Sequence, residues 1–485
     1  MTEQIVLSLI SHTNLGKTSM ARTLLRQDVG TVADQPHVTD QSTPYELMAT
    51  EQLTVQIWDT PGFGSVKPLL DRLNQEKNFW GWLMHEVVDR LRNRPLFCSV
   101  EAARHVRSTS DVVLYLVQAR ETPADAGYLK MELKLLEALA KPLFLILNHT
   151  GDDSEEVVGN QLQTWHKAFL PSPIYRGAMV LDSFCRHWSQ EMALFEMVAP
   201  SINPNLQAAF SIWRMAYQNR ESNREQQAAS IIAALVCQAA GWQTTRAGRS
   251  DKQIFEEVSN ELNFQLQKCV QELVTLYGLD QEGQTRIQAQ IDDLDRGLYS
   301  PLSENKTGFW ASVISGATGG LAADLAAGGM TFGGGFVLGA LLGGLGGFGL
   351  AKASQWFVGS AKLHWRPTFL FQYFSLILGY WMQVAHHGRA RGPLPVDRDQ
   401  LHIPQSLLPK WEASQATAVN DFSDFFENLD LPLKSEQSIK DAQTFLTGLA
   451  QKTLELTHLT PRALQVIPTN PSPKPDQDLP QNKQP

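Results

Sequence analysis

The sequence predicts an α/β fold with a doubly wound, mostly parallel sheet. A mainly α-helical part with a glycine-rich helical hairpin should follow it. Two observations predict the sheet: apolar runs alternate with amphipathic segments, and polar motifs stand where such runs end. Apolar residues at helical spacing from about residue 190 onward predict the helical part. With 485 residues, the chain is long enough for two or three domains.

Six apolar segments are expected to be strands. Val112–Val117 is a continuous apolar run, as strands buried on both faces of a sheet are. Leu53–Trp58 instead alternates apolar and polar residues. The expected strands are Ile5–Ile10, Tyr45–Met48, Leu53–Trp58, Val112–Val117, Leu143–Leu147 and Gly177–Leu181. Helices are predicted over Ser19–Arg26, Asp125–Ala140 and Ile254–Tyr277.

A phosphate-binding loop is predicted directly after the first strand. Residues 11 to 19 read Ser-His-Thr-Asn-Leu-Gly-Lys-Thr-Ser and lead into a predicted helix. In this context backbone N–H groups and a helix N-terminus point at a phosphate. Lys17 would reach the β- and γ-phosphates, and the Thr18 hydroxyl would bind Mg²⁺. The candidate nucleotide-binding residues of the loop are Ser11, His12, Thr13, Asn14, Leu15, Gly16, Lys17, Thr18 and Ser19.

A second motif, Asp59-Thr60-Pro61-Gly62, ends the expected strand Leu53–Trp58. An aspartate at this position can hold Mg²⁺ through water, and the N–H of Gly62 is free to meet a γ-phosphate. Alone, Asp-x-Pro-Gly would be an ordinary turn. Because Asp59 comes 42 residues after Lys17 of the phosphate-binding loop, the two motifs together indicate a nucleotide site.

These two motifs resemble those of translation-factor-class GTPases of the Era, TrmE and septin-like branch. Asn14 stands where this branch carries an asparagine that helps to hold a monovalent cation, so the resemblance makes K⁺ a candidate ligand. Phe63 stands where Ras-like proteins carry the water-orienting glutamine. The whole chain is similar to a bacterial group that fuses such a domain to a C-terminal domain of unknown function.

Two positions depart from the family pattern. Ser11 replaces a glycine, and a residue with a Cβ tolerates unusual backbone angles less well. The base-specificity motif Asn-Lys-x-Asp is expected after Leu143–Leu147, where Asn148-His149-Thr150-Gly151 stands. Asn148 is retained, but glycine occupies the position of the aspartate that reads guanine. Asp152 or Asp153 would substitute if the loop shifted, so the preference for guanine rests on the resemblance.

The resemblance also implies a first switch with a threonine that closes onto Mg²⁺. Thr39 is the preferred candidate, as a catalytic and metal-binding residue beside Lys17, and Thr43 is the alternative. Thr43 precedes Pro44, which favours an extended conformation. Residues 64–111 are long for a second switch and are expected to be an insertion. They form either an aromatic helical packing element or a nucleotide-gated surface.

The resemblance therefore implies a GTP-binding switch, a GTPase that uses GTP/GDP and Mg²⁺ and hydrolyses GTP slowly. We expect turnover to rise with K⁺, dimerisation or a partner, because the sequence contains no obvious water-orienting group. The alternatives are an ATP-using P-loop enzyme and a membrane or scaffold protein with a vestigial nucleotide site. Competition between GTP and ATP separates the first, and tight binding abolished by Lys17→Ala excludes the second.

Composition limits the partners and the compartment. The net charge of −9 and pI near 5.8 argue against a general nucleic-acid-binding surface. The four cysteines are far apart, which suits a reducing compartment and offers no metal site. The N-terminus enters the first strand directly, so we expect a cytoplasmic protein without a signal peptide.

The segment between Lys306 and Lys352 contains one charge, Asp324, in 45 residues. Small residues occupy every fourth position from Ala311 to Ala351, which puts a smooth stripe on one helix face. Two helices of about 20 residues would fit a hairpin in the inner membrane, with both lysines on the cytoplasmic side. A buried hairpin in a soluble domain, or a self-association face of a homodimer, is the alternative.

A second uncharged segment, Phe369–Val384, is long enough to lie in a membrane interface. Whether it does so, as a peripheral anchor, or packs inside a soluble domain is left open by the sequence. The expected organisation is 1–190 nucleotide domain, 191–304 helical region, 305–360 glycine-rich hairpin, 361–460 helical C-terminal region and 461–485 disordered tail.

Overall fold

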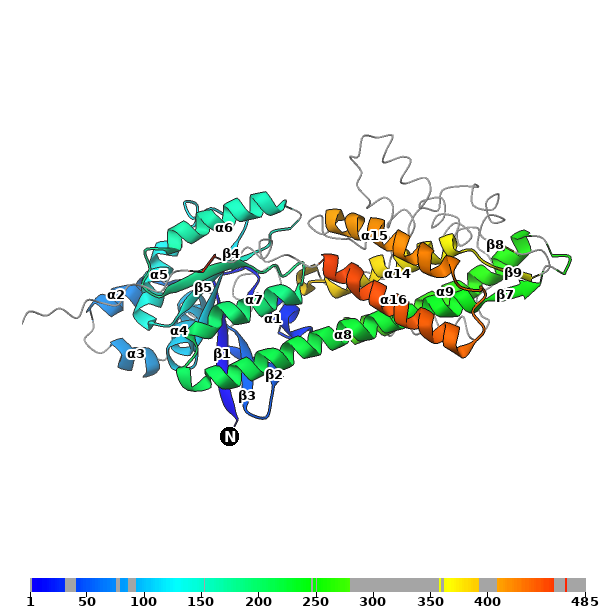
Figure 1. Cartoon of the computed structure of the whole chain (residues 1–485). Coiled ribbons are helices and arrows are strands. Elements are labelled where there is room, and N and C mark those ends of the chain that lie inside the picture. Colours follow the sequence, from blue (N-terminus) through cyan, green and yellow to red (C-terminus); the bar gives the residue numbers. More distant parts are fainter. Residues whose placement is uncertain are drawn as a thin grey trace, which may run out of the picture.

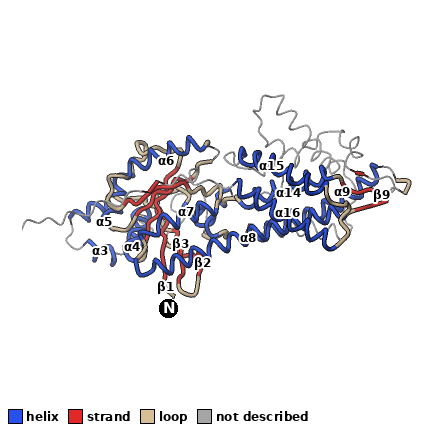
Figure 2. Tube along the Cα trace, viewed as in Figure 1, coloured by secondary structure: helices blue, strands red, loops and turns tan. Residues whose placement is uncertain are grey.

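The computed structural model describes residues 2–30, 41–75, 79–85, 93–151, 153–245, 247–249, 251–279, 357–358, 362–391, 408–457 and 467–468. Figure 1 shows a sheet flanked by helices next to a bundle of helices. The long helix α8 (Gln207–Gly241) runs along both parts. The larger set of strands gathers in the N-terminal part (Figure 2).

The N-terminal sheet has the strand order β10-β6-β5-β4-β1-β3-β2. The pairs from β6 to β3 are parallel, and the edge strands β2 and β10 are antiparallel. This confirms the predicted mostly parallel sheet, with each expected strand found within two residues of its bounds. The strands are β1 (Glu3–Ile10), β2 (Thr43–Ala49), β3 (Leu53–Asp59), β4 (Val112–Gln118), β5 (Leu143–Asn148), β6 (Tyr175–Val180) and β10 (Ile467–Pro468). Strand β10 lies in the stretch for which we expected disorder, and the rest of that stretch lies outside the described residues.

Helices cover both faces of this sheet. They are α1 (Lys17–Leu25), α2 (Lys67–Gln75), α3 (Phe79–His85), α4 (Arg94–Ser108), α5 (Leu129–Leu139), α6 (Glu155–Phe169) and α7 (Trp188–Val198). Helix α5 begins at Leu129, one turn later than predicted. The reason is a turn closed by Thr122, whose hydroxyl donates to Asp125 at 2.6 Å and whose carbonyl accepts from the Asp125 N–H at 3.0 Å.

The insertion at residues 64–111 packs its aromatic residues into the domain. Phe79 and Leu83 of α3 are buried in the same core as α4 and α5. The guanidinium of Arg107 lies 4.6 Å from the centroid of the Trp80 ring. That of Arg72 lies 4.5 Å from the Trp82 ring. The described part of the insertion is therefore a packed helical element.

The C-terminal part is a helical bundle with a small three-stranded sheet at one end. Its further helices are α9 (Asp251–Leu276), α14 (Pro367–Ala385), α15 (Leu408–Glu427) and α16 (Glu436–Thr457). The small sheet contains β7 (Gln243–Thr245), β8 (Phe357–Val358) and β9 (Lys362–Trp365). The described cysteines, Cys98, Cys185, Cys237 and Cys269, are buried and form no disulfide bond with one another.

Helix α14 lies at the centre of this bundle. Leu370, Phe374, Ile377 and Trp381 are fully buried in its core. Of the two alternatives for Phe369–Val384, the structure shows packing within the helical part. No helix within the described ranges combines the length and apolar content needed to span a bilayer. Residues 305–356 of the expected glycine-rich hairpin lie outside the described residues.

Helix α8 belongs to two hydrophobic cores. Phe210, Trp213 and Tyr217, near its start, pack with β1, β3 and α7. Ile232 and Val236, near its end, pack in the core of the bundle. The domain boundary expected at residue 190 lies inside α7, whose Phe195 belongs to the core of the sheet.

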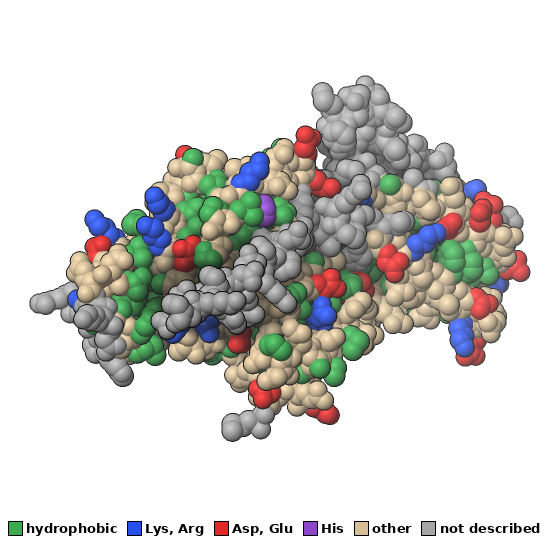
Figure 3. All heavy atoms as spheres, turned by 60° about the vertical axis from the view of Figure 1, so that its left-hand side comes forward, with side chains coloured by type: hydrophobic (Ala, Val, Ile, Leu, Met, Phe, Trp, Pro, Cys, Tyr) green, Lys and Arg blue, Asp and Glu red, His purple; other side chains and the backbone are tan. Residues whose placement is uncertain are grey.

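The described surface carries mixed charge on the face shown in Figure 3. Lys and Arg side chains lie among Asp and Glu side chains on that face, without a continuous basic area among the described residues.

Candidate nucleotide-binding site

The predicted motifs meet at one edge of the sheet. Ser11 follows β1, Asp59 ends β3 and Asn148 ends β5, all at the carboxyl ends of parallel strands. Ligands of open α/β sheets bind at this edge. The structure therefore brings together the residues that the sequence placed in one site.

The loop at residues 11–16 has the backbone that a phosphate-binding loop requires. Asn14 and Gly16 adopt left-handed conformations, with φ of 62° and 82°. Asparagine and glycine tolerate this region better than other residues. Ser11 has no positive φ, so its Cβ is compatible with the backbone of the loop.

The Ser11 hydroxyl also has partners of its own. It accepts from Lys17 Nζ at 2.9 Å and donates to the His12 carbonyl at 2.5 Å. Lys17 opens helix α1 and is 7% exposed. Burial lowers the pKa of Lys17, against the opposing charges of Asp59 and Glu132. The ammonium group is thus held inside the loop, directed at Ser11.

Gly62 lies close against the loop. A Cβ at this position would lie 2.9 Å from Thr13 Cα and 3.0 Å from Lys17 Nζ. Only glycine fits there, so the backbone between Asp59 and Phe63 can approach the space where Lys17 points. This is the proximity that the predicted role of the Gly62 N–H needs.

Thr18 and Asp59 form the candidate Mg²⁺ site. The Thr18 hydroxyl donates to Asp59 Oδ2 at 2.6 Å, although the residues come from α1 and β3. Hydroxyl and carboxylate oxygens are ligands that Mg²⁺ prefers, so the donor set fits the ion. Thr39 lies outside the described residues. Thr43 opens β2 opposite Asp59 in register, and its hydroxyl bonds the Gln41 carbonyl at 3.4 Å.

Phe63 is fully buried in the core next to the site. Its N–H donates to the Ser11 carbonyl at 3.0 Å, which joins the segment after Asp59 to the phosphate-binding loop. At the position of the glutamine in Ras-like proteins, this side chain thus serves packing.

Asn148 links the phosphate-binding loop to the loop after β6. Its side-chain N–H donates to the Leu15 carbonyl at 3.2 Å. Its oxygen accepts from the Ser183 N–H at 2.9 Å and from the Ser183 hydroxyl at 3.0 Å. His149 has φ of 57°, and a Cβ on Gly16 would meet its ring at 2.7 Å. The imidazole therefore lies on the phosphate-binding loop.

Gly151 leaves the position of the guanine-reading aspartate without a side chain. A Cβ there would have only Arg120 nearby, at 3.9 Å. Asp153 accepts from Gln161 of α6 at 3.3 Å, and Asp152 lies outside the described residues. The Asp182 carboxylate accepts hydrogen bonds from the Thr150 hydroxyl at 2.7 Å and from the Gly151 N–H at 3.2 Å. Asp182 follows β6, the strand paired with β5, and fixes this loop from there.

Glu132 is a site residue that the sequence reasoning missed. It is 1% exposed and accepts from Tyr115 at 2.6 Å, and His12 Nδ1 lies 2.7 Å from it. Burial raises its pKa, against hydrogen bonds from His12 and Tyr115. The His12 ring also stacks on Tyr128 with centroids 4.0 Å apart. A carboxylate on the apolar face of α5 was the available signal.

Comparison with known families assigns the chain. A family model described as a domain of unknown function, DUF3482, matches residues 176–451, more than half of the chain. The chain belongs to this family. A model described as 50S ribosome-binding GTPase matches residues 6–149, which include the phosphate-binding loop, Asp59 and Asn148. The DUF3482 protein thus carries a P-loop GTPase domain at its N-terminus, as the sequence predicted. Among curated proteins, none matches this chain.

Several solved GTPase structures are similar to the DUF3482 protein. Era of Aquifex aeolicus bound to GDP and AlF4⁻ has 14% identity and a TM-score of 0.28, over 37% of this chain and 52% of that one. A mutant of NFeoB from S. thermophilus bound to GMPPNP has 18% identity and a TM-score of 0.24, over 37% and 55%. Toc33 from Arabidopsis thaliana, a dimerization-deficient mutant, has 14% identity and a TM-score of 0.25, over 37% and 71%. The chain spans about half the length of the Era structures it matches.

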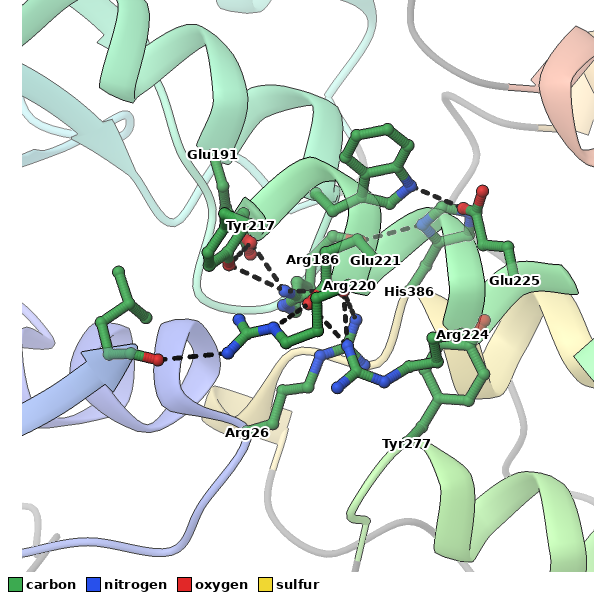
Figure 4. A network of polar contacts seen from close by, with 12 residues as sticks. Arg26, Arg186, Glu191, Tyr217, Arg220, Glu221, Arg224, Glu225, Tyr277 and His386 are labelled. Carbon is green, nitrogen blue, oxygen red and sulfur yellow. Dashed lines mark hydrogen bonds and ion pairs between the residues drawn. The ribbon is translucent and has the colours of Figure 1, made fainter. Parts of the chain in front are cut away.

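A buried polar network joins the GTPase domain to α8 (Figure 4). Arg26, which caps the C-terminus of α1, donates to Glu221 of α8 at 2.8 Å. Arg186, after β6, donates to Glu191 of α7 at 2.6 Å. Tyr217 of α8 donates to the same Glu191 oxygen at 2.5 Å. The network therefore links α1, the loop after β6 and α7 to helix α8.

The charges of this network compensate one another. Glu221 is 1% exposed, and burial alone would raise its pKa. The charges of Arg186, Arg26 and Arg224 outweigh burial and hold the pKa of Glu221 well below its ordinary value. Glu221 therefore stays ionised as the common anion of several arginines.

Proposed function

We propose that this DUF3482 protein is a GTP-binding switch with slow, Mg²⁺-dependent GTP hydrolysis. The observation that carries the proposal is the 2.6 Å contact between Thr18 and Asp59 beside the buried Lys17. A hydroxyl, a carboxylate and an ammonium group from separate elements converge where a phosphate-binding loop opens a helix. This arrangement suits binding of a nucleoside triphosphate with its metal ion.

The residues present support charge stabilisation during hydrolysis. Lys17 and the loop N–H groups would neutralise charge that builds on the β–γ bridging oxygen. Thr18 and Asp59 would hold Mg²⁺, with Thr39 as the sequence candidate for a third ligand, and the ion supplies positive charge at the β- and γ-phosphates. Because Phe63 is buried in the core, no side chain at that position orients water, which supports slow turnover.

Two properties of the site concern selectivity. Asn14 is the candidate residue for K⁺ beside the phosphates, and it is exposed in the loop. For the base, guanine remains the proposal on family grounds. Adenine is the second candidate because Gly151 offers no acceptor and Asp153 is turned to Gln161.

We further propose that the nucleotide state is coupled to the helical part. The polar network around Glu221 supports this, since it connects the end of α1 with α8. Binding of a γ-phosphate changes the position of switch segments in GTPases, and α1 begins at the phosphate-binding loop. A shift of α1 would be felt at Arg26.

Attachment to the inner face of the membrane, or self-association as a homodimer, stays a prediction from the glycine-rich segment at 305–356. Full-length protein mixed with vesicles of acidic phospholipid is expected to sediment with them. Protein that stays in the supernatant with GDP and with GTP analogues contradicts membrane attachment. Size-exclusion chromatography with light scattering tests the dimer in the same samples.

The central experiment measures nucleotide binding by the full-length protein. Fluorescent GDP is titrated in Mg²⁺, GTP and ATP compete, and phosphate release reports hydrolysis. Lys17→Ala is expected to weaken binding about 10- to 100-fold, because it removes a charge-assisted contact to phosphate. Lys67→Ala removes an exposed lysine of α2 and is the matched control. Equal affinity of Lys17→Ala and wild type would reject the proposed function.

A further inference from the structure

We infer that residues 386–391, the segment that follows α14 in the helical part, position the nucleotide-reading Asn148 and so set the rate of nucleotide release. The inference rests on the proposed function and names its regulation. The segment acts through Ser183 and Thr23, to which it is hydrogen-bonded.

Backbone hydrogen bonds join this segment to the loop after β6 in a short ladder. The Arg186 N–H donates to the His386 carbonyl at 3.0 Å, and the Gly388 N–H donates to the Phe184 carbonyl at 3.3 Å. Cys185 and His387 form an antiparallel bridge between them. The segment thus extends the loop 182–187 as a strand would.

The segment also contacts Ser183, within this loop. The Ala390 N–H donates to the Ser183 carbonyl at 3.1 Å. The Thr23 hydroxyl of α1 donates to the same carbonyl at 3.0 Å and accepts from the Arg389 N–H at 2.9 Å. Ser183 and Thr23 are 0% and 3% exposed, so water does not replace these partners without opening the interface.

Ser183 in turn contacts Asn148 of the candidate site. Both donors of Ser183 hold the oxygen of Asn148, whose side-chain N–H in turn holds the Leu15 carbonyl of the phosphate-binding loop. A chain of hydrogen bonds therefore runs from residue 390 to the loop. Displacement of the segment frees Ser183, and with it the orientation of Asn148.

Arg389 fixes the segment to the end of α1. Its guanidinium donates to the Arg26 carbonyl at 2.9 Å, and also to Asp28 and to the Gly278 carbonyl after α9. The side chain is nine-tenths buried. Arg389 thus ties its segment both to the end of the P-loop helix α1 and to the residue after the bundle helix α9.

Gly388 makes the contact testable. A Cβ at this position would lie 2.2 Å from the Ser183 carbonyl oxygen and 2.4 Å from the Phe184 carbonyl carbon. Both atoms are backbone, so Gly388→Ala must push the segment and the loop apart. Gly448→Ala in α16 is the matched control, because a Cβ there meets nothing within 4 Å.

The experiment measures, by stopped flow, the dissociation of fluorescently labelled GDP from full-length wild type, Gly388→Ala and Gly448→Ala. Gly388→Ala is expected to release the nucleotide about tenfold faster, as the loss of one or two buried hydrogen bonds predicts. Gly448→Ala should match wild type. A second variant, Thr23→Val, keeps the shape of the side chain and should also accelerate release.

A double-mutant cycle separates positioning from general loosening. If the segment acts through Asn148, Gly388→Ala has little further effect in an Asn148→Ala background. Equal release rates in wild type and Gly388→Ala, or additive effects with Asn148→Ala, overturn the inference. Wild type that binds no nucleotide rejects the proposed function instead. If ADP binds in place of GDP, the same variants are measured with labelled ADP.

Discussion

Arg26 and Glu221 form a buried ion pair, 2.8 Å long, between the end of the P-loop helix and the middle of α8. The residues are 195 positions apart in the chain. Arg26 also lies over the ring of Tyr277, 4.9 Å from its centroid. Because α1 starts at the phosphate site, this pair is the most direct ionic contact described between that helix and α8.

The first prediction concerns the charge of Glu221. Glu221→Gln keeps the shape of the side chain but leaves Arg26, Arg186 and Arg224 without their common counter-charge. We expect a loss of about 3 kcal/mol in the free energy of unfolding, measured by urea denaturation. The side chains of Arg104 and Glu101 on α4 are 22% and 27% exposed, against 1% for Glu221, so Glu101→Gln should change stability by less than about 1 kcal/mol. Equal stability of the two variants would contradict the role of Glu221.

The same variant has a defined pH dependence. The pKa of folded Glu221 lies below the ordinary value of 4.5, so its stabilisation is fully present above that value. It is lost as the pH falls below the ordinary value towards the folded one. The stability difference between wild type and Glu221→Gln should therefore shrink below about pH 4.5 and stay constant above about pH 6. A stability difference that grows as the pH falls would contradict a lowered pKa of Glu221.

The second prediction concerns the anchor of the phosphate-binding loop. His12→Ala removes the contact to Glu132 and the stack on Tyr128. We expect affinity for fluorescent GDP to fall about tenfold, because one hydrogen bond and one ring stack are lost. Tyr128→Phe keeps the ring and loses only its bond to Glu121, so it should bind as wild type does. Unchanged affinity in His12→Ala would show that the loop holds its shape without this anchor.

The third prediction tests the cation at Asn14. Its φ of 62° makes glycine a better replacement than alanine, since glycine takes this conformation without strain. Wild type should hydrolyse GTP faster in K⁺ than in Na⁺, and Asn14→Gly should lose the difference. Steady-state phosphate release in the two salts measures it. Equal wild-type rates in both salts would exclude the cation role.

The fourth prediction concerns the base. Gly151→Asp places a carboxylate where the family reads guanine, and the space there is open apart from Arg120. Aspartate tolerates the φ of 61° better than most residues. We expect the preference for GTP over ATP to rise about tenfold in competition assays, through hydrogen bonds to a charged acceptor. Gly127→Asp adds the same charge at a position with open space and should leave the preference unchanged.

The local parts of the site were predictable from the sequence. The phosphate-binding loop, Asp59 and the strands follow from short patterns whose geometry is set by neighbouring residues. That serine can replace the family's glycine at position 11 is clear only from the fold, in which Ser11 has no positive φ. The contact between Thr23 and Arg389 joins residues 366 positions apart, and no local pattern marks it. Glu132 was visible as a carboxylate on an apolar face, but its partners His12 and Tyr115 came from other elements.

Helix α8 has a mechanical consequence. At 1.5 Å per residue, its 35 residues form a rod about 50 Å long. Near one end, its own Phe210, Trp213 and Tyr217 are buried in the core of the sheet, and towards the other end its Ile232 and Val236 are buried in the core of the bundle. A tilt of about 5° at the first end would move the second by about 4 Å. Small adjustments near a nucleotide would thus be amplified into a displacement that a distant partner can sense.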